Sequence, residues 1–471
     1  MARPRRAGLR PGERRLILIL GDLLAAAGGA VLALALWGRF DYLVTEAGLG
    51  LLAFIQARAP WFVFLPLLWP IFLANLYDVH RAASWKETLR GVWIAGGLAA
   101  TAYLAVYFLQ EGSLARRGIL YFLGATILLT LVWRLIYIRI FTAPAFLRRV
   151  LVVGAGEGGR TLMRVFNELW PKPFFLVGLI DDDREKQGTI IEGAHVLGDN
   201  SRMLDVVDQH AVSDIIVAIQ GPMNGEMFQA LLDAQQRGVE IARMPAVYEE
   251  LLGRVPIRHL ESDWMLRSFV DELRVSSFYL LLKRLVDVAG GVLGLLALAV
   301  VCGPVALAIL LESGRPVLFR QTRLGQGGRV YSVVKFRTMR QDAESDGQAH
   351  WAKEGDPRTT RVGTLLRRMH LDEFPQFWNV LRGEMSLVGP RPERPELVAE
   401  LEKSIPFYRA RLLVQPGLSG WAQVNYGKGA SLEGSADKLE YDLYYIKHRS
   451  LTIDAWIVLR TLGSVFGFRG V

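Results

Sequence analysis

The sequence predicts a multi-domain α/β membrane protein with three parts. They are a four-helix transmembrane bundle, a Rossmann-like doubly wound domain, and an α+β catalytic domain with a re-entrant membrane helix. The first observation is that 51% of its 471 residues are hydrophobic and its mean hydropathy is positive, which is too apolar for an ordinary soluble enzyme. The second is a glycine-rich turn after an apolar run near residue 150. The third is an apolar stretch, Leu285–Leu311, broken at Gly303-Pro304 and followed by a segment dense in acids and arginines.

Composition also limits the possible partners. The formal charge of +9 suits anionic lipid headgroups or a phosphorylated substrate, but charge alone does not separate these from nucleic acid. The one cysteine, Cys302, excludes an intrachain disulfide and a cysteine-rich metal site.

Residues 1–145 predict the membrane bundle. Four apolar segments of about 20 residues, the length that a bilayer requires, lie at 16–37, 61–76, 91–109 and 118–141. Basic residues precede the first segment, separate the second from the third and follow the fourth, which places both ends of the bundle in the cytoplasm. Asp22 lies inside the first segment, where we expect it to snorkel or to pack helices rather than to catalyse.

Residues 146–257 predict the Rossmann-like domain. An apolar strand at 149–153 precedes Gly154, Gly156 and Gly159, and a second strand ends before Asp181. This glycine spacing lets a backbone approach a pyrophosphate at a helix N-terminus, and Asp181 is placed to reach a ribose. The same turn also serves simple packing of a strand against a helix. Both interpretations stay open, and we favour the scaffold.

A polar connector, 258–279, leads into the apolar stretch, whose path is ambiguous. Proline removes a backbone donor and clashes with the preceding turn, so Gly303-Pro304 favours a re-entrant helix over about 283–311. Kinked helices that span the membrane also exist. A spanning helix would put everything after residue 312 outside the cell.

Beyond this stretch the pattern predicts a hairpin and two helices. Strands at 316–320 and 330–337 flank a glycine-rich turn, which puts Lys335 and Arg337 on one face. One helix ends near His370, and we expect a new helix to begin near Asp372 with Pro375 in its first turn. Asp372 would then cap that helix and be held ionised.

Asp372 and Glu373 form the candidate catalytic pair. With Lys335, Arg367 and Arg391 they suit a site for Mg²⁺ and a diphosphate, because carboxylates bind hard cations and arginines bind phosphate oxygens. The alternative is structural: a capping aspartate beside a solvated glutamate, with the arginines facing lipid headgroups.

Several ordered motifs carry a family resemblance. They are Lys283-Arg284-Leu285-Val286-Asp287, Lys335-Phe336-Arg337-Thr338-Met339, Leu371-Asp372-Glu373-Phe374-Pro375-Gln376, Asn379-Val380-Leu381-Arg382-Gly383, Met385 to Pro392, and Gly420 to Asn425. With these motifs, residues 280–471 resemble the bacterial sugar transferase family, the monotopic phosphoglycosyl transferases. Such enzymes move a sugar-1-phosphate from a UDP-sugar to a polyprenyl (undecaprenyl) phosphate in exopolysaccharide, capsule or O-antigen assembly.

The resemblance implies a role for each matched residue. Asp372 is the nucleophile that forms an aspartyl phosphosugar and releases UMP, Glu373 is its partner, and both hold Mg²⁺. Phosphates are contacted by Lys335, Arg367 and Arg391, while Pro390 and Pro392 face the uridine. The membrane helix bends at Gly303 and Pro304 and re-enters the cytoplasmic leaflet.

It also implies a place: the bacterial inner membrane, multi-pass, with the catalytic domain in the cytoplasm and in contact with lipid. Nucleic acid is disfavoured as a partner because the arginines are interleaved with proline turns and membrane segments, with no recognition helix or aromatic platform. A homodimer is left open. Departures from the family at Gln415, Gly303 and Asn425–Ser431 leave the donor sugar (glucose, galactose or other) and the polysaccharide open.

The main alternative is a membrane-anchored nucleotide-sugar dehydratase or epimerase. That class needs a catalytic Tyr-x-x-x-Lys, and the chain has two such pairs, Tyr279 with Lys283 and Tyr331 with Lys335. Neither is predicted on a helix of a second Rossmann unit, so this alternative is disfavoured, as is a non-catalytic assembly protein.

Overall fold

The computed structural model describes residues 11–40, 64–77, 82–109, 116–141, 147–170, 172–259, 276–341, 343, 356–426 and 431–466. Contacts divide the chain into two compact units, Met1–Leu251 and Leu252–Val471. Each unit is considered by itself.

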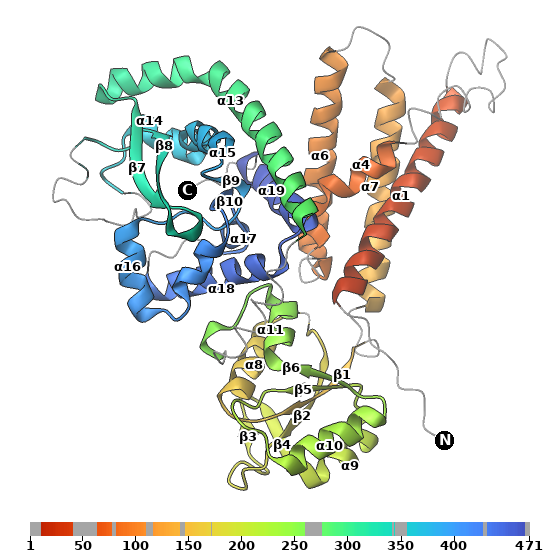
Figure 1. The fold of residues 1–471 in the computed structure, drawn as a ribbon. Helices are drawn as coiled ribbons and strands as arrows, with labels where there is room; N and C mark the ends of the chain where they lie inside the picture. The colour runs from red at the N-terminus through yellow and green to blue at the C-terminus, as the bar shows by residue number, and fades with distance from the viewer. Residues whose placement is uncertain are drawn as a thin grey trace. The chain divides into compact units, whose positions relative to one another are not determined.

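The first unit begins with helices α1 (Pro11–Phe40), α4 (Leu65–Phe72), α6 (Trp85–Leu109) and α7 (Arg116–Phe141), with a 3-10 turn, η1 (Ala74–Tyr77), after α4. Helices α1 and α7 pack together over much of their length (Figure 1). Gly21 and Gly29 allow this approach, because a Cβ at either position would overlap Trp133 or Thr126 of α7. Small residues serve this purpose in membrane helices.

Asp22 and Arg134 join α1 to α7. Arg134 Nη2 lies 2.6 Å from Asp22 Oδ2, both side chains are fully buried, and Arg134 also donates to the carbonyl of Leu76 at 2.9 Å. The expected helix-packing role of Asp22 is confirmed.

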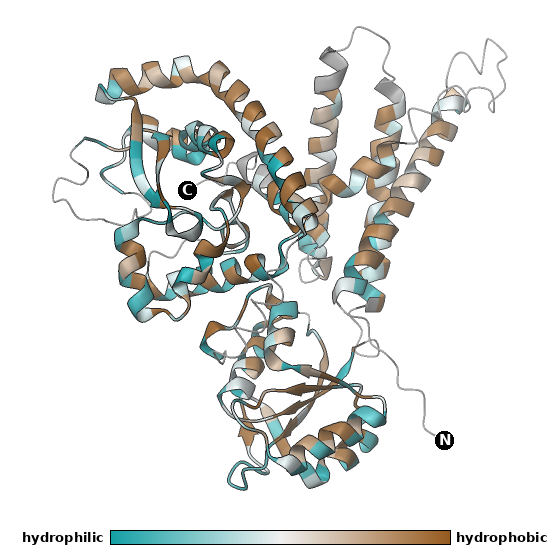
Figure 2. Ribbon diagram, in the orientation of Figure 1, coloured by the Kyte–Doolittle hydropathy of each residue, from teal (hydrophilic) through white to brown (hydrophobic). Residues whose placement is uncertain are grey.

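Three helices among the described residues are long and apolar enough to cross a membrane: Gly12–Phe40, Gly118–Ile140 and Ser277–Ser313. Figure 2 shows their hydrophobic colouring. Of the predicted segment 61–76, residues 61–63 lie outside the described residues and the rest forms α4 and η1. At 1.5 Å per residue, the eight residues of α4 cover only about 12 Å. The four-helix bundle therefore stays a prediction.

The α/β domain contains a six-stranded sheet of order β3-β4-β2-β1-β5-β6. Its strands are β1 (Arg149–Val153), β2 (Phe175–Ile180), β3 (Ile190–Ile191), β4 (Ala194–Gly198), β5 (Asp214–Val217) and β6 (Glu240–Arg243). All pair in parallel except β3 with β4. Helices α9 (Asn200–Gln209) and α10 (Gly225–Gln236) cover one face, and α8 (Glu157–Glu168) lies on the other (Figure 1). The doubly wound prediction is confirmed, and α11 (Met244–Leu252) closes the domain.

The second unit opens with a turn, η3 (Ile257–His259), and the long helix α13 (Ser277–Ser313), and it contains the predicted hairpin, β7 (Leu318–Leu324) with β8 (Val330–Phe336). The remaining elements are η4 (Gln326–Gly328), α14 (Arg361–Arg368), η5 (Leu371–Gln376), α15 (Phe377–Arg382), β9 (Ser386–Val388), α16 (Pro395–Ser404), η6 (Tyr408–Leu413), β10 (Gly417–Ser419), α17 (Trp421–Asn425), α18 (Leu432–His448) and α19 (Leu451–Phe466). Its core joins α16, α18 and α19 through residues such as Val398, Leu443 and Ile457. Of the predicted connector, residues 260–275 lie outside the described residues.

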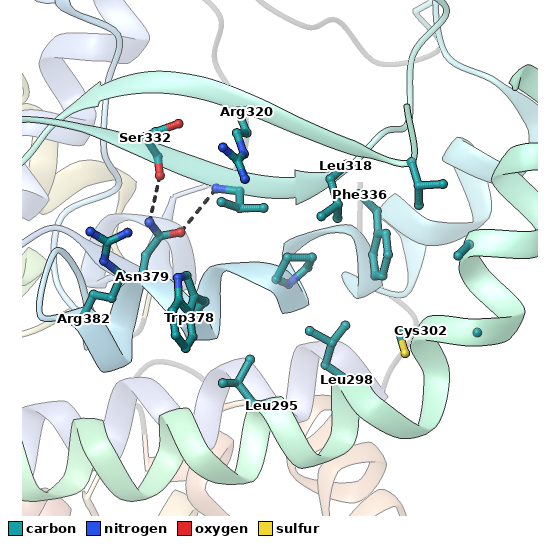
Figure 3. A pocket seen from close by; sticks show the side chains of 15 residues that line it. Leu295, Leu298, Cys302, Leu318, Arg320, Ser332, Phe336, Trp378, Asn379 and Arg382 are labelled. Carbon is teal, nitrogen blue, oxygen red and sulfur yellow. Dashed lines mark hydrogen bonds between the residues drawn. The ribbon is translucent and has the colours of Figure 1, made fainter. Parts of the chain in front are cut away.

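Helix α13 runs as one helix from Ser277 to Ser313 but is bent (Figure 3). Pro304 lies inside it, and the ribbon changes direction beside Cys302 (Figure 3). Its 37 residues correspond to about 55 Å at 1.5 Å per residue, well beyond a bilayer core of about 30 Å.

Candidate active site

Strand β8 places Lys335 and also supports the helices that carry the acids. The Asn379 side chain of α15 accepts from the amide of Val334 at 3.3 Å and donates to the carbonyl of Ser332 at 2.8 Å. It thus satisfies the free edge of β8, which fixes α15 and the preceding η5 along the strand.

A sharp turn at His370 starts the segment that carries Asp372 and Glu373. His370 adopts the left-handed conformation (φ 57°), and residues 371–376 form a 3-10 helix. A helix does begin near Asp372, at Leu371, as expected, but the expected cap is wrong: His370 is the cap position, Asp372 lies inside η5, and Pro375 is its fifth residue. The left-handed turn, which nothing in the local sequence signals, ends α14 and restarts the chain as the tighter helix.

Glu373 is the most strongly held acid of the site. Its Oε1 accepts from Lys335 Nζ at 2.9 Å and from Arg391 Nη2 at 2.7 Å. The side chain is 15% exposed, so the alternative of a solvated glutamate is wrong. Three parts of the fold therefore meet at Glu373 Oε1: the hairpin through Lys335, η5 through Glu373 itself, and the loop after β9 through Arg391.

Asp372 is buried, and no hydrogen bond to its carboxylate occurs among the described residues. Burial, with the neighbouring charge of Glu373, raises the pKa of Asp372 above its usual range. Burial acts in the same direction on Glu373, but Arg391 and Lys335 outweigh it and hold the pKa of Glu373 well below its usual range. The two neighbouring acids thus have opposite shifts, a pattern typical of catalytic pairs. The expected stabilisation of Asp372 by helix amides is absent.

Arg367, in the last turn of α14, lies near enough to interact with the charge of Asp372. Its guanidinium donates to Thr338 Oγ1 at 2.9 Å and to Thr359 Oγ1 at 3.3 Å. The negative charge of Asp372 favours the protonated form of this guanidinium. Arg337 does not join this group, because it donates to the carbonyl and hydroxyl of Ser313 at 2.7 and 2.9 Å. Lys335 and Arg391 thus contact Glu373 directly, and Arg367 is near Asp372; their roles toward a substrate stay a prediction.

The turn Pro390-Arg391-Pro392 is held by three consecutive carbonyls. The carbonyl of Pro390 accepts from the Gly417 amide at 2.9 Å, that of Arg391 from Arg411 Nη2 at 3.1 Å, and that of Pro392 from Arg323 Nη1 at 2.9 Å. Sequence reasoning missed Arg411 and Arg323, since neither lies in one of the quoted motifs.

Two carboxylates alone do not form a complete metal site, and no cluster of three or more metal-binding side chains occurs within the described residues. Mg²⁺ is commonly held by one or two carboxylates together with substrate phosphates. Asp372 and the second oxygen of Glu373 fit that arrangement.

The glycine turn of the α/β domain is shaped mainly by packing. Gly154 has φ +104°, and a Cβ on Gly159 would overlap the carbonyl of Gly154, whereas Gly156 faces open space. Asp181 Oδ2 accepts from the amide of Ala155 at 2.6 Å. The predicted ribose-binding acid thus already stabilises the turn.

Known proteins resemble the chain over nearly its whole length. Residues 278–468 match the model of the bacterial sugar transferase family, and residues 73–245 match a CoA-binding domain. Undecaprenyl-phosphate glucose phosphotransferase of Komagataeibacter xylinus is 31% identical over 469 residues, which cover 95% of this chain and 83% of that protein. The chain belongs to the bacterial sugar transferase family.

Two further relatives differ in their named sugar. UDP-glucose:undecaprenyl-phosphate glucose-1-phosphate transferase of Xanthomonas campestris pv. campestris is 28% identical, with 91% of this chain and 92% of that protein covered. UDP-N-acetylgalactosamine-undecaprenyl-phosphate N-acetylgalactosaminephosphotransferase of Aeromonas hydrophila is 39% identical, but the match spans only 57% of this chain and 63% of the relative. In this bacterial sugar transferase, the two acids and the basic residues Lys335, Arg367 and Arg391 all lie in the region that matches the family.

Proposed function

We propose that this bacterial sugar transferase moves a sugar-1-phosphate from a UDP-sugar to undecaprenyl phosphate or a similar polyprenyl phosphate. The observation that carries the proposal is the buried Asp372, beside Glu373 and surrounded by Lys335, Arg367 and Arg391. The names of the relatives supply donor and acceptor. The product would be the first lipid-linked sugar of a surface polysaccharide.

The reaction has two displacement steps at one phosphorus atom. A carboxylate oxygen of Asp372 attacks the β-phosphorus of the UDP-sugar, the bond to the bridging oxygen breaks, and UMP leaves with that electron pair. A phosphate oxygen of the acceptor then attacks the same phosphorus and displaces Asp372. Dividing one transfer between two large anions into two steps is the advantage of covalent catalysis.

The residues around Asp372 have separate tasks. Lys335 and Arg391 stabilise charge on the phosphate oxygens and keep Glu373 ionised, and Arg367 does the same near Asp372. Mg²⁺, held by Asp372, Glu373 and the diphosphate, would neutralise further charge. Pro390 and Pro392 shape the side where the uridine lies.

Helix α13 serves as a re-entrant wedge in the cytoplasmic leaflet. Near its start, Lys283 donates to the carbonyl of Val388 at 3.0 Å and to Asp454 at 2.9 Å. At its end, Glu312 accepts from the amides of Arg361 and Val362 at 2.7 and 2.8 Å. Because both ends bind the same folded unit, they belong on the same side of the membrane, which supports re-entry.

The remaining membrane segments complete this topology, with a four-helix bundle in the inner membrane and both soluble domains in the cytoplasm. Labelling of cysteines introduced at Met1 and Glu312 tests it. We expect both to react only with reagents that reach the cytoplasm.

The dehydratase or epimerase alternative has no support in the geometry. Tyr279 donates to Asp454 at 3.0 Å and Lys283 binds the same carboxylate, while Lys335 is paired with Glu373. The lysines of both Tyr-x-x-x-Lys pairs are therefore bound to carboxylates, Lys283 to Asp454 and Lys335 to Glu373.

A direct test measures UMP release from a panel of UDP-sugars with polyprenyl phosphate and Mg²⁺. We expect sustained release only with all components present, and a fall of at least about 10³-fold in Asp372→Asn. Glu396→Gln, at an exposed acid of α16, is the control and should keep full turnover. Normal turnover in Asp372→Asn would remove Asp372 as the nucleophile.

A further inference from the structure

A cavity of about 640 Å³ lies between the bend of α13, the hairpin, Pro375 of η5 and α15. Figure 3 shows Leu295 and Leu298 of α13 on one side and Leu318, Arg320 and Phe336 of the hairpin on the other. Its size is in the range of small-molecule and lipid sites. Most of the lining is apolar, and the cavity is not part of the acid cluster described above.

The hairpin separates this cavity from the charged groups of the active site. Ladder pairs put Leu318 opposite Phe336 and Arg320 opposite Val334, and all four line the cavity. Residues on alternate positions, such as Lys335 and Arg323, lie on the opposite face and contact Glu373 and Pro392. The face of the hairpin toward α13 is thus mainly apolar where it lines the cavity, with Arg320 and Ser332 as its polar members there. The opposite face carries the charged contacts of Lys335 and Arg323.

Helix η5 connects the two faces at the edge of β8. Pro375 lines the cavity, and it lies three residues after Asp372 in a 3-10 helix, where positions i and i+3 share a side. A molecule in the cavity therefore lies beside the turn that carries Asp372. The opposite wall is α13, whose outer residues Leu296 and Val300 are 62% and 79% exposed for contact with lipid.

Two cations, Arg320 and Arg382, join the mainly apolar lining. Arg382 pairs with Glu384 at 3.3 Å, whereas Arg320 is exposed and no salt bridge or hydrogen bond of its side chain occurs among the described residues. Trp378, 52% exposed, borders the same space. An apolar cavity open toward a membrane helix, with a free guanidinium, is complementary to a lipid with an anionic head.

We propose that this cavity binds the isoprenoid segment next to the phosphate of the acceptor lipid, and that Arg320 provides charge for its head. The inference rests on the proposed function and deepens it. In this arrangement the isoprenoid chain of the lipid stays on the membrane face of the hairpin. Its phosphate passes the edge of β8 beside Pro375 to reach Asp372. An apolar cavity suits an isoprenoid chain, and ordinary phospholipid is the competing occupant for the test.

Cys302 offers a test in the unmodified enzyme. It is the one cysteine of the chain, it is exposed, and it lines the cavity. The rate of its alkylation by an apolar maleimide is measured in detergent with polyprenyl phosphate, with the same mole fraction of phosphatidylglycerol, or with UDP-sugar alone. We expect polyprenyl phosphate at ten times its Kd to slow labelling roughly tenfold, and the other two to have no effect.

Substitutions extend the test to turnover. Ala306→Phe fills the cavity, and Ala299→Phe places the same ring on the exposed side of α13. We expect Ala306→Phe to raise the acceptor KM by about tenfold, with Ala299→Phe unchanged. Exchange of labelled UMP into the UDP-sugar, which needs no acceptor, should stay normal in both. Arg320→Ala should raise the acceptor KM, and Arg329→Ala, at the hairpin turn, should not.

The outcomes separate the two proposals. Equal labelling of Cys302 with and without polyprenyl phosphate, in an enzyme that transfers sugar, overturns the cavity assignment alone. Equal protection by phosphatidylglycerol assigns the cavity to bulk lipid and also overturns it. Protection by polyprenyl phosphate in an enzyme that releases no UMP keeps the cavity and refutes the transferase reaction. Because labelling uses the unsubstituted chain, misfolding of Ala306→Phe leaves the decision intact.

Discussion

Arg411 donates a hydrogen bond of 3.1 Å to the main-chain carbonyl of Arg391, whose guanidinium binds Glu373. Arg411 is itself fixed by Asp442 at 2.7 Å and by the hydroxyl of Tyr408 at 2.7 Å, and it is only 6% exposed. A buried arginine on η6 therefore positions Arg391, the proposed phosphate-binding arginine, through its backbone.

A double-mutant cycle tests this positioning role. We expect Arg411→Lys to lower kcat by about tenfold with little change in donor KM, because lysine lacks the fork whose Nη2 reaches Asp442 and the carbonyl while Nη1 reaches Tyr408. In an Arg391→Lys background the same substitution should have almost no further effect on kcat. Arg409→Lys, exposed and two residues away, is the matched control. Independent losses that multiply would show that Arg411 only supports the fold.

Asp442 gives a stability prediction that depends on pH. Burial raises the pKa of Asp442 to about 6 despite the pair with Arg411. The folded protein therefore keeps a proton that the unfolded chain releases near pH 3.8, so this contribution is full below that pH and is lost as the pH rises through 6. Relative to Asp442→Asn, the wild-type Tm should rise as the pH falls from 7 to 5. A Tm difference that stays constant across this range contradicts the shift.

The features that sequence predicted well are set by local patterns. Strands of the doubly wound sheet follow from apolar runs such as Arg149–Val153. The glycines of the β7–β8 turn mark the hairpin, since Gly327 and Gly328 take positive φ. The membrane helices follow from length and hydropathy alone.

The errors and omissions concern structure that distant residues decide. The left-handed turn at His370 replaced the predicted cap, and no local residue pattern signals it. The meeting of Lys335, Glu373 and Arg391 joins positions 38 and 18 residues apart. The chemistry of the residue types and the family resemblance grouped them as one site, but no spacing along the chain specifies these contacts. Arg411 and Arg323 left no such trace, because neither lies in a quoted motif and each holds the turn through a main-chain carbonyl, which no side-chain pattern reveals.

The buried pair of Asp22 and Arg134 predicts contrasting effects of single and double substitutions. Asp22→Ala should destabilise the helix bundle by about 3–5 kcal/mol, because it leaves the guanidinium buried without its partner. Asp22→Leu combined with Arg134→Met removes both charges and should recover most of that loss. Thermal unfolding in detergent measures both. Equal destabilisation by the single and double variants would contradict the pairing argument.

The glycines of the α/β domain allow scaffold and nucleotide binding to be separated in one experiment. Gly159→Ala should cost about 1–3 kcal/mol of stability, because its Cβ would overlap the carbonyl of Gly154. Gly156→Ser should be tolerated, since Gly156 faces open space in extended backbone at the cap of α8 and serine is a good capping residue. Its added hydroxymethyl group would nevertheless obstruct a pyrophosphate at that turn. If the domain is only a scaffold, as we expect, adding a dinucleotide to the full chain leaves the Tm of both the wild type and Gly156→Ser unchanged. A rise in wild type that Gly156→Ser abolishes would instead establish a nucleotide site.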